Sequence, residues 1–242
     1  MTGTENMRAK ASRMAEGKEK FIEHISKRLG RNSVPDTPTP LVMPHTVHHD
    51  YLMDAGIAEL KKIFIKNAEA SGTTVYQCDL VHLNKTVVNA VAAFGNGPVV
   101  MADHDFFSEN GTFEVLKKHF DQLKIWDLSL SRDENIANAE QASVGIAKAE
   151  LALVESGTVV LFSHLGSGRS VSLLPTYTVI IIRIQDLRPR LTQAMSFLRE
   201  QIDKGLPTSV NFISGASATA DIELIRVQGV HGPMAISYVI VG

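Results

Sequence analysis

The segment 214–223 combines small, hydroxyl-bearing residues with two carboxylates. Its candidate ligand-binding residues are Ser214, Gly215, Ser217, Asp221 and Glu223. It follows a strand-like run, and small residues let backbone N–H groups and hydroxyls approach an anion closely. The alternative is a turn followed by a helix that Ser217 or Thr219 caps. The spacing alone leaves both interpretations open.

A histidine with glycine neighbours follows in Gly229-Val230-His231-Gly232-Pro233. Imidazole titrates near neutral pH, so His231 is a candidate acid or base, with Gly232 beside the ligand. The same histidine could instead satisfy a backbone carbonyl in a tight turn. Glu155 lies between two apolar runs. It is either a carboxylate in a perturbing environment or an exposed residue at a hairpin corner.

Arg169 is a candidate anion ligand in the glycine-containing run Gly166-Ser167-Gly168-Arg169-Ser170. This run lacks the spacing and the lysine of the phosphate-binding loop, so we exclude that motif. A guanidinium still binds a carboxylate or phosphate through two parallel hydrogen bonds. We therefore expect Arg169 to bind an anionic group.

Metal and nucleophile motifs are weak in this sequence. The histidines of 45–50 have no partner ligands nearby, and we expect no metal site there. Cys78 is the single cysteine, in a strand-like run, and we expect it to be a small buried residue. One thiolate cannot hold an iron–sulfur cluster, which normally needs four, so we expect no such cofactor in this chain.

Composition is that of an ordinary globular protein. The 242 residues are 44% hydrophobic and 21% charged, with a formal net charge of −2. This charge argues against a nucleic-acid-binding protein. Arg183 interrupts the longest apolar run well short of the roughly 20 residues that span a membrane. The N-terminus has no signal-peptide pattern, so we expect a cytoplasmic protein. A homo-oligomer is compatible with the sequence.

Two regions differ in pattern. Residues 5–29 favour a helix with an apolar stripe, and three prolines between 35 and 40 favour an extended linker. We therefore predict an N-terminal helix and linker over 1–49 and an α/β domain over 50–242. From residue 55 to 142, helical and strand-like runs alternate, which is typical of βαβ units. Closely spaced strand-like runs follow, then an amphipathic helix over 190–204 and final strands at 210–213 and 235–241.

Five stretches, in this order, resemble the LUD-domain family and within it the C-type lactate-utilization proteins. They are 139–146, 155–158, 168–175, 214–223 and 229–233, and the likeness extends from Phe21 to the C-terminus. Ala216 and Ala218 depart from the pattern, where proline and a polar residue are usual. The resemblance implies a mixed, mostly parallel sheet with helices on both faces, similar to the sugar-isomerase and CoA-transferase group.

The resemblance also implies membership of a three-protein system that oxidises L-lactate to pyruvate, in which the other two members are iron–sulfur proteins. Under one hypothesis this chain binds the small 2-hydroxy or 2-oxo acid. Arg169 would pair with its carboxylate, His231 would accept a proton, and Glu155, Asp221 or Glu223 would orient them. Alternatives are a non-catalytic assembly or regulatory subunit, or an acyl or CoA-type ligand-binding protein.

Overall fold

The computed structural model describes residues 17–34, 42, 44–219 and 227–242. The chain divides into two units, 1–45 and 46–242. In the first unit residues 17–28 are helical. Residues 5–16 of the predicted N-terminal helix and the prolines of the predicted linker lie outside the described residues.

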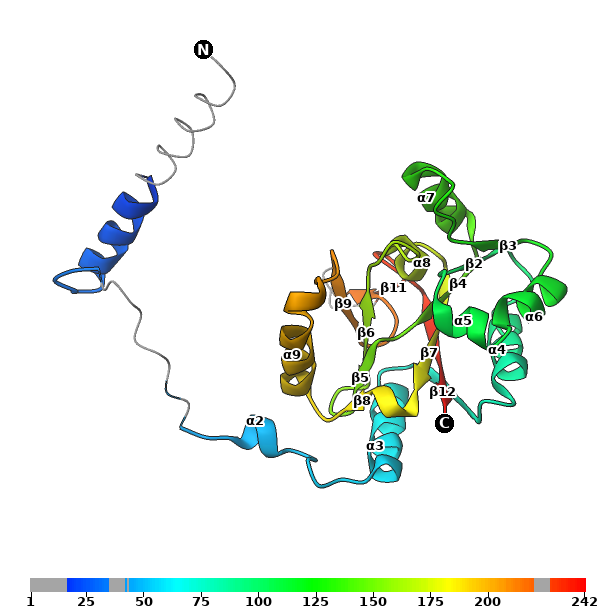
Figure 1. The fold of residues 1–242 in the computed structure, drawn as a ribbon, viewed down its shortest axis with the longest axis horizontal. Helices are drawn as coiled ribbons and strands as arrows, with labels where there is room; N and C mark the ends of the chain where they lie inside the picture. The colour runs from blue at the N-terminus through cyan, green and yellow to red at the C-terminus, as the bar shows by residue number, and fades with distance from the viewer. Residues whose placement is uncertain (1–16, 35–41, 43, 220–226) are drawn as a thin grey trace, which may run out of the picture. The chain divides into compact units, whose positions relative to one another are not determined.

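A six-stranded, fully parallel sheet forms the centre of the second unit, as the alternation of helices and strands predicts (Figure 1). In spatial order its strands are β1 (Thr74–Cys78), β12 (Ala235–Val241), β7 (Tyr177–Arg183), β4 (Val144–Lys148), β2 (Val99–Met101) and β3 (Leu123–Ile125). β7 is buried from Thr178 to Ile182, as expected for a central strand covered on both faces.

One face of this sheet packs against helices. They are α4 (Leu83–Ala92), α5 (Asp105–Glu109) and α6 (Thr112–His119). Val179 and Ile181 of β7 point into this core with Val87 of α4. Side chains alternate between faces along a strand, so the intervening Ile180 and Ile182 lie in the second core.

The opposite face packs against α3 (Ile57–Ala70) and a second, four-stranded sheet. This sheet has the order β8 (Leu187–Arg188), β5 (Leu151–Leu153), β6 (Thr158–Phe162) and β9 (Val210–Ile213). The amphipathic α9 (Leu191–Glu200) packs on it, with Ala194 against Leu151, Leu153 and Val160 (Figure 1). The predicted helix 190–204 ends earlier than expected, because 202–204 form a 3₁₀ turn.

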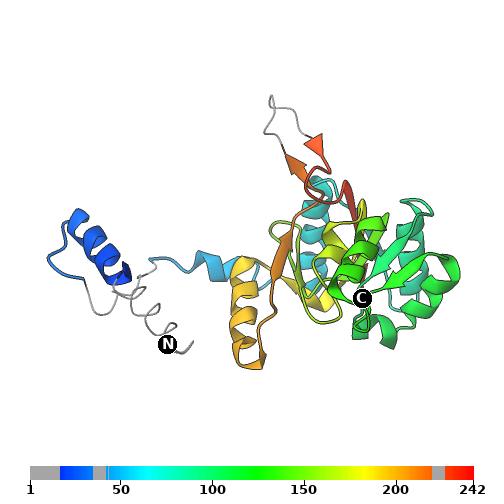
Figure 2. The ribbon, with the colours of Figure 1, turned by 90° about the horizontal axis from the view of Figure 1, so that it is seen from above.

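The remaining helices and strands complete the unit. They are α2 (Val47–Asp50), α7 (Arg132–Gln141), α8 (Ser170–Leu173) and the paired strands β10 (Ala218–Thr219) and β11 (Val227–Gln228). Ser131 and Glu134 form a reciprocal capping box that starts α7. Figure 2 shows β10 and β11 projecting from the sheets. Residues 218–219 therefore form a strand, so Ser217 does not cap a helix; the residues that would follow a cap at Thr219 lie outside the described residues.

Candidate functional site

Six ionisable side chains meet where the chain leaves the carboxyl ends of the parallel strands. We call them the carboxyl-end cluster: His104, Lys148, Glu150, His164, Arg183 and Asp186. Lys148 and Arg183 are the last residues of β4 and β7, and from there the chain crosses to β5 and β8 of the second sheet. Ligands of open α/β sheets bind beyond the carboxyl ends of strands, so this position is the first place to search for function.

Lys148 and Arg183 are held by carboxylates. The Lys148 ammonium, whose side chain is 2% exposed, lies 3.2 Å from Asp186 Oδ2 and 3.4 Å from Glu150 Oε2. Arg183 donates to both oxygens of Asp186, at 2.8 and 3.0 Å. A buried ammonium is tolerated only when such partners compensate its lost hydration. The two cations and two carboxylates therefore form a balanced network that fixes the strand ends.

His104 connects this network to α5. Its Nε2 lies 3.2 Å from Glu150 Oε1, and its Nδ1 accepts a hydrogen bond from the Phe106 backbone N–H at 3.1 Å. The second bond needs a lone pair on Nδ1, so the ring proton is on Nε2 and is donated to Glu150. Burial alone would raise the pKa of Glu150, but the His104 hydrogen bond and the Lys148 charge outweigh it and hold that pKa below its usual value.

His164 follows β6 and lies edge-on to His104, with ring centroids 5.7 Å apart. Its Nδ1 accepts the Gly166 backbone N–H at 3.2 Å, so the ring proton of the neutral imidazole is on Nε2. Partial burial, and then the neighbouring His104 ring, lower the pKa of His164 below its ordinary value. The ring is therefore neutral at pH 7 and can donate a hydrogen bond to a ligand.

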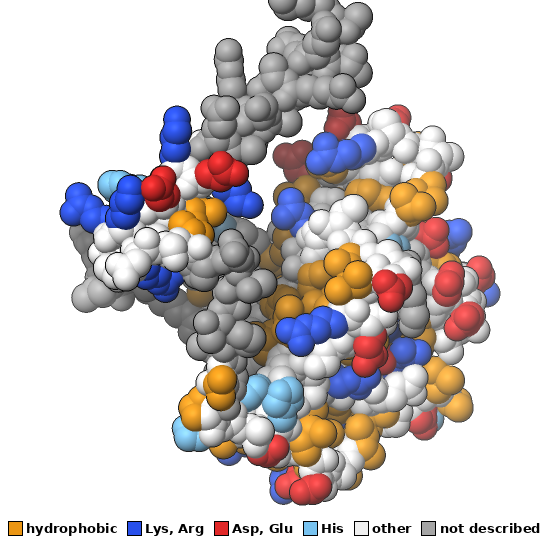
Figure 3. Space-filling view, turned by 60° about the vertical axis from the view of Figure 1, so that its left-hand side comes forward, with side chains coloured by type: hydrophobic (Ala, Val, Ile, Leu, Met, Phe, Trp, Pro, Cys, Tyr) orange, Lys and Arg blue, Asp and Glu red, His pale blue; other side chains and the backbone are white. Residues whose placement is uncertain are grey.

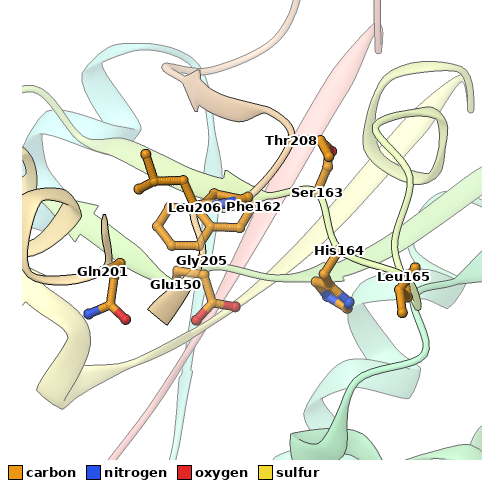
Figure 4. Close-up of a pocket in the computed structure, with 10 residues that line it drawn as sticks. Glu150, Phe162, Ser163, His164, Leu165, Gln201, Gly205, Leu206 and Thr208 are labelled. Atoms are coloured by element: carbon orange, nitrogen blue, oxygen red, sulfur yellow. The ribbon is translucent and has the colours of Figure 1, made fainter. Parts of the chain in front are cut away.

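Two hollows meet at Phe162, Ser163 and His164. The larger, about 560 Å³, is lined by Glu150 and His164 and by apolar residues that include Phe162 and Leu206 (Figure 4). The smaller, which we call the polar cleft, holds only about 10 Å³, roughly one water molecule. Its polar lining residues are His104, Lys148, Ser163, His164, Ser167, Arg169, Ser172 and Asn211.

The structure places the predicted anion ligand Arg169 in the wall of the polar cleft. Arg169 is exposed and directly precedes α8. Among the described residues, no carboxylate pairs with its guanidinium, in contrast to Lys148 and Arg183. It is therefore a cation that is available to a ligand beside two histidines.

Three other predicted residues meet at the opposite end of the sheet. Ser217 Oγ accepts the His231 backbone N–H at 3.4 Å, and the Ser217 backbone N–H donates to Pro233 at 2.9 Å. A Cβ on Gly232 would lie 3.3 Å from Ser217 Cβ. These residues precede β12, whose seven residues span about 20 Å. They therefore lie at the end of the sheet opposite to the carboxyl-end cluster, and no hydrogen bond or ion pair among the described residues joins His231 to Arg169.

Ser214, Gly215 and Glu155 have structural partners. Ser214 Oγ lies 2.5 Å from Thr158 Oγ1, and Glu155 forms an ion pair of 2.7 Å with Arg190 after β5. Gly215 has a φ of +75°, and a Cβ there would lie 2.8 Å from the Ser71 carbonyl oxygen. The predicted residues Asp221 and Glu223 lie outside the described residues.

Sequence reasoning predicted none of the six members of the carboxyl-end cluster as site residues; it predicted only the strands that they follow. A usable signal exists, because Lys148, Arg183 and His104 each stand at or just after the end of an apolar strand. Such a position at the carboxyl end of a parallel strand points to a site. The ion pair between Lys148 and Asp186 forms only because β4 and β7 are neighbours in the sheet. The two strands are far apart in the sequence, so the sequence alone does not reveal this.

The described part of the chain shows neither a group of three metal-ligating side chains nor a helix that is long and apolar enough to cross a membrane. The candidate metal ligands His48 and His49 both lie in α2, with their ring centroids 4.2 Å apart.

On the visible face of the second unit, acidic and basic side chains are interspersed (Figure 3). This distribution differs from the continuous basic face of a nucleic-acid-binding protein.

Comparison with known proteins agrees with this architecture. The LUD domain profile matches residues 61–241. Lactate utilization protein C of a Geobacillus species is 38% identical, with 93% of this chain and 95% of that protein covered. The Bacillus subtilis protein of that name is 34% identical, with 93% and 96% covered. A DUF162 family crystal structure from Deinococcus radiodurans superposes with a TM-score of 0.57 at 18% identity, covering 77% of this chain and 99% of that one. The chain is a homologue of lactate utilization protein C and belongs to the LUD-domain family.

Proposed function

We propose that this chain is the small-acid-binding component of a lactate-utilization system, and that a 2-hydroxy or 2-oxo acid binds at the polar cleft. The observation that carries the proposal is the Arg169 guanidinium, which has no carboxylate partner among the described residues, in the same cleft as the neutral His164. Relatives over almost the whole chain carry the name lactate utilization protein C, which supports this substrate class.

In this proposal Arg169 pairs with the carboxylate of the acid through two hydrogen bonds. His164 Nε2–H donates to the 2-hydroxy or 2-oxo oxygen. The balanced charges of Lys148, Glu150, Arg183 and Asp186 keep His104 and the strand ends in place. The closed cleft must widen to admit three carbons, and the adjoining 560 Å³ hollow supplies the route.

Oxidation of lactate to pyruvate releases two electrons and two protons, and the electrons need an acceptor. One cysteine does not provide the ligand set of an iron–sulfur cluster. We therefore assign the electron-accepting clusters to two partner iron–sulfur proteins, and to this chain the binding and orientation of the acid.

Isothermal titration calorimetry with pyruvate and with L-lactate tests the proposal. We expect saturable binding that Arg169→Ala weakens at least about tenfold, a loss of about 1.4 kcal/mol. Arg199→Ala, which removes an exposed arginine from α9, is the matched control and should bind normally. Absence of heat at millimolar acid, or equal binding by Arg169→Ala, contradicts the proposal. Lactate-dependent dye reduction with both partners, with and without this chain, then tests its part in turnover.

An assembly role is the second candidate, and a different observation favours it. Phe21, Ile25 and Leu29 repeat every four residues on and just after the helix 17–28, and they are 66%, 42% and 61% exposed. Such an apolar stripe can bind a partner protein. Replacing all three with serine in the full chain should abolish capture of the iron–sulfur partners while pyruvate binding persists. Unchanged capture removes this helix from the interaction.

A further inference from the structure

A third cavity, of about 420 Å³, lies on the other side of Arg169, between α7 and α8. We call it the indole cavity. Its lining residues are Trp126, Arg132, Ile136, Gly168, Arg169, Ser170, Leu173 and Leu174. The volume is within the range of about 300–1,000 Å³ that small-ligand pockets occupy.

The charged residues that line this cavity are all basic. Two arginines, Arg132 and Arg169, line the cavity, and no carboxylate is among the described residues that line it. Neither arginine has an ion-pair partner in the part of the chain that the structure describes. Glu134, in the first turn of α7, accepts hydrogen bonds from Ser131 instead. The cavity therefore selects for an anion, and paired arginines suit a phosphate.

The rest of the lining is flat and apolar. Trp126 is half-buried, directly follows β3, and is anchored by its backbone N–H to the Met101 carbonyl at 2.8 Å. The far edge of its indole rests on Gly168, where a Cβ would lie 2.4 Å from Trp126 Cη2. The only cation over an aromatic ring among the described side chains is Arg190 over Tyr51, so no arginine covers the indole. Leu173 and Ile136 complete an apolar wall around it.

From these observations we infer that the indole cavity binds a nucleotide. An aromatic base or other flat heterocycle stacks against Trp126, and its phosphate lies between Arg132 and Arg169. Stacking on an indole accepts any aromatic ring, whereas the guanidiniums require the phosphate. Inorganic phosphate alone would make no contact with the apolar wall, and an uncharged ring would offer no anion to the arginines.

Trp126 is the single tryptophan of the chain, so tryptophan fluorescence reports on the surroundings of this one side chain. The protein is titrated with AMP and with FMN, then with adenosine, riboflavin and inorganic phosphate, and binding is followed in parallel by calorimetry. We expect saturable binding of at least one nucleotide, with its phosphate-free form and inorganic phosphate each bound at least about tenfold more weakly. Binding of AMP would indicate an adenine nucleotide, and binding of FMN would indicate a flavin nucleotide.

Arg132→Gln is the decisive variant, because Arg132 is exposed at the start of α7 and does not line the polar cleft. It should weaken nucleotide binding at least about tenfold and leave pyruvate binding unchanged. Arg199→Gln is the control for loss of one charge. The inference is overturned if neither nucleotide binds saturably, if the phosphate-free ring or inorganic phosphate binds as well as the nucleotide, or if Arg132→Gln binds normally. Failure of pyruvate to bind would reject the proposed function but not this site.

Discussion

Lys148 and Asp186 form an ion pair of 3.2 Å between side chains that are only 2% and 8% exposed. Lys148 ends β4, and Asp186 lies in the short 3₁₀ turn (Ile184–Asp186) after β7. The pair therefore joins neighbouring chain segments at the point where both leave the parallel sheet for the second sheet. Its geometry sets the position of Glu150, and through it that of His104.

Removing the Lys148 ammonium should destabilise the fold strongly. Lys148→Met leaves the buried Asp186 carboxylate and the half-buried Glu150 carboxylate without one of their cations, and breaking a buried pair costs about 3–5 kcal/mol. Urea unfolding followed by circular dichroism measures the loss. Lys118→Met on the exposed surface of α6 is the control. A loss below about 1 kcal/mol would show that the network contributes little.

The pKa of Glu150 makes stability depend on pH. That pKa is lower in the folded chain than its ordinary value of 4.5, so the unfolded chain binds the proton more readily. The carboxylate stabilises the fold fully above pH 4.5, and this contribution is lost as the pH falls through the lower, folded pKa. Glu150→Gln should therefore flatten the acid side of the stability profile, measured by urea unfolding at a series of pH values. Glu200→Gln on the exposed end of α9 should keep the wild-type slope, and an identical slope for both variants refutes the assignment.

The Tyr238 hydroxyl should stabilise the loop that holds Ser214. Tyr238 is fully buried, and its hydroxyl lies 3.3 Å from the Ile213 carbonyl and 3.4 Å from that of Gly157. Burial raises its pKa to about 12, so it remains a donor throughout the neutral range. Tyr238→Phe should lower the free energy of unfolding by about 1 kcal/mol, the typical value of one hydrogen bond. Tyr51→Phe at an exposed site is the comparison; equal stability of both variants would contradict this role.

The indole cavity depends on Gly168. A Cβ at this position would lie 2.4 Å from Trp126, so Gly168→Ala must displace the indole. We expect a shift of the tryptophan emission and a loss of about 1–3 kcal/mol, as for other overpacked sites. Gly17→Ala, where nothing lies within 4 Å of the added Cβ, should change neither property. Emission identical to wild type in Gly168→Ala would exclude the contact.

The fold follows largely from sequence patterns. The apolar run Thr178–Ile182 predicts a strand covered on both faces, and the alternation from residue 55 to 142 predicts the parallel sheet. The five-residue α5 was not predicted, because its start depends on the His104 side chain accepting the Phe106 N–H. The periodicity of so short a segment carries little information.

The candidate site could not be predicted in the same way, because its residues lie far apart in the sequence. The residue types of Arg169 and His231 indicate anion binding and acid–base chemistry, and the single cysteine leads us to expect no iron–sulfur cluster in this chain. Only the tertiary structure decides which residues meet. Strand order sets β4 beside β7 and brings Lys148 to Asp186, while the length of β12 separates His231 from the carboxyl-end cluster. Sequence determines the chemistry each side chain can offer, and the packing of non-consecutive strands determines which of them act together.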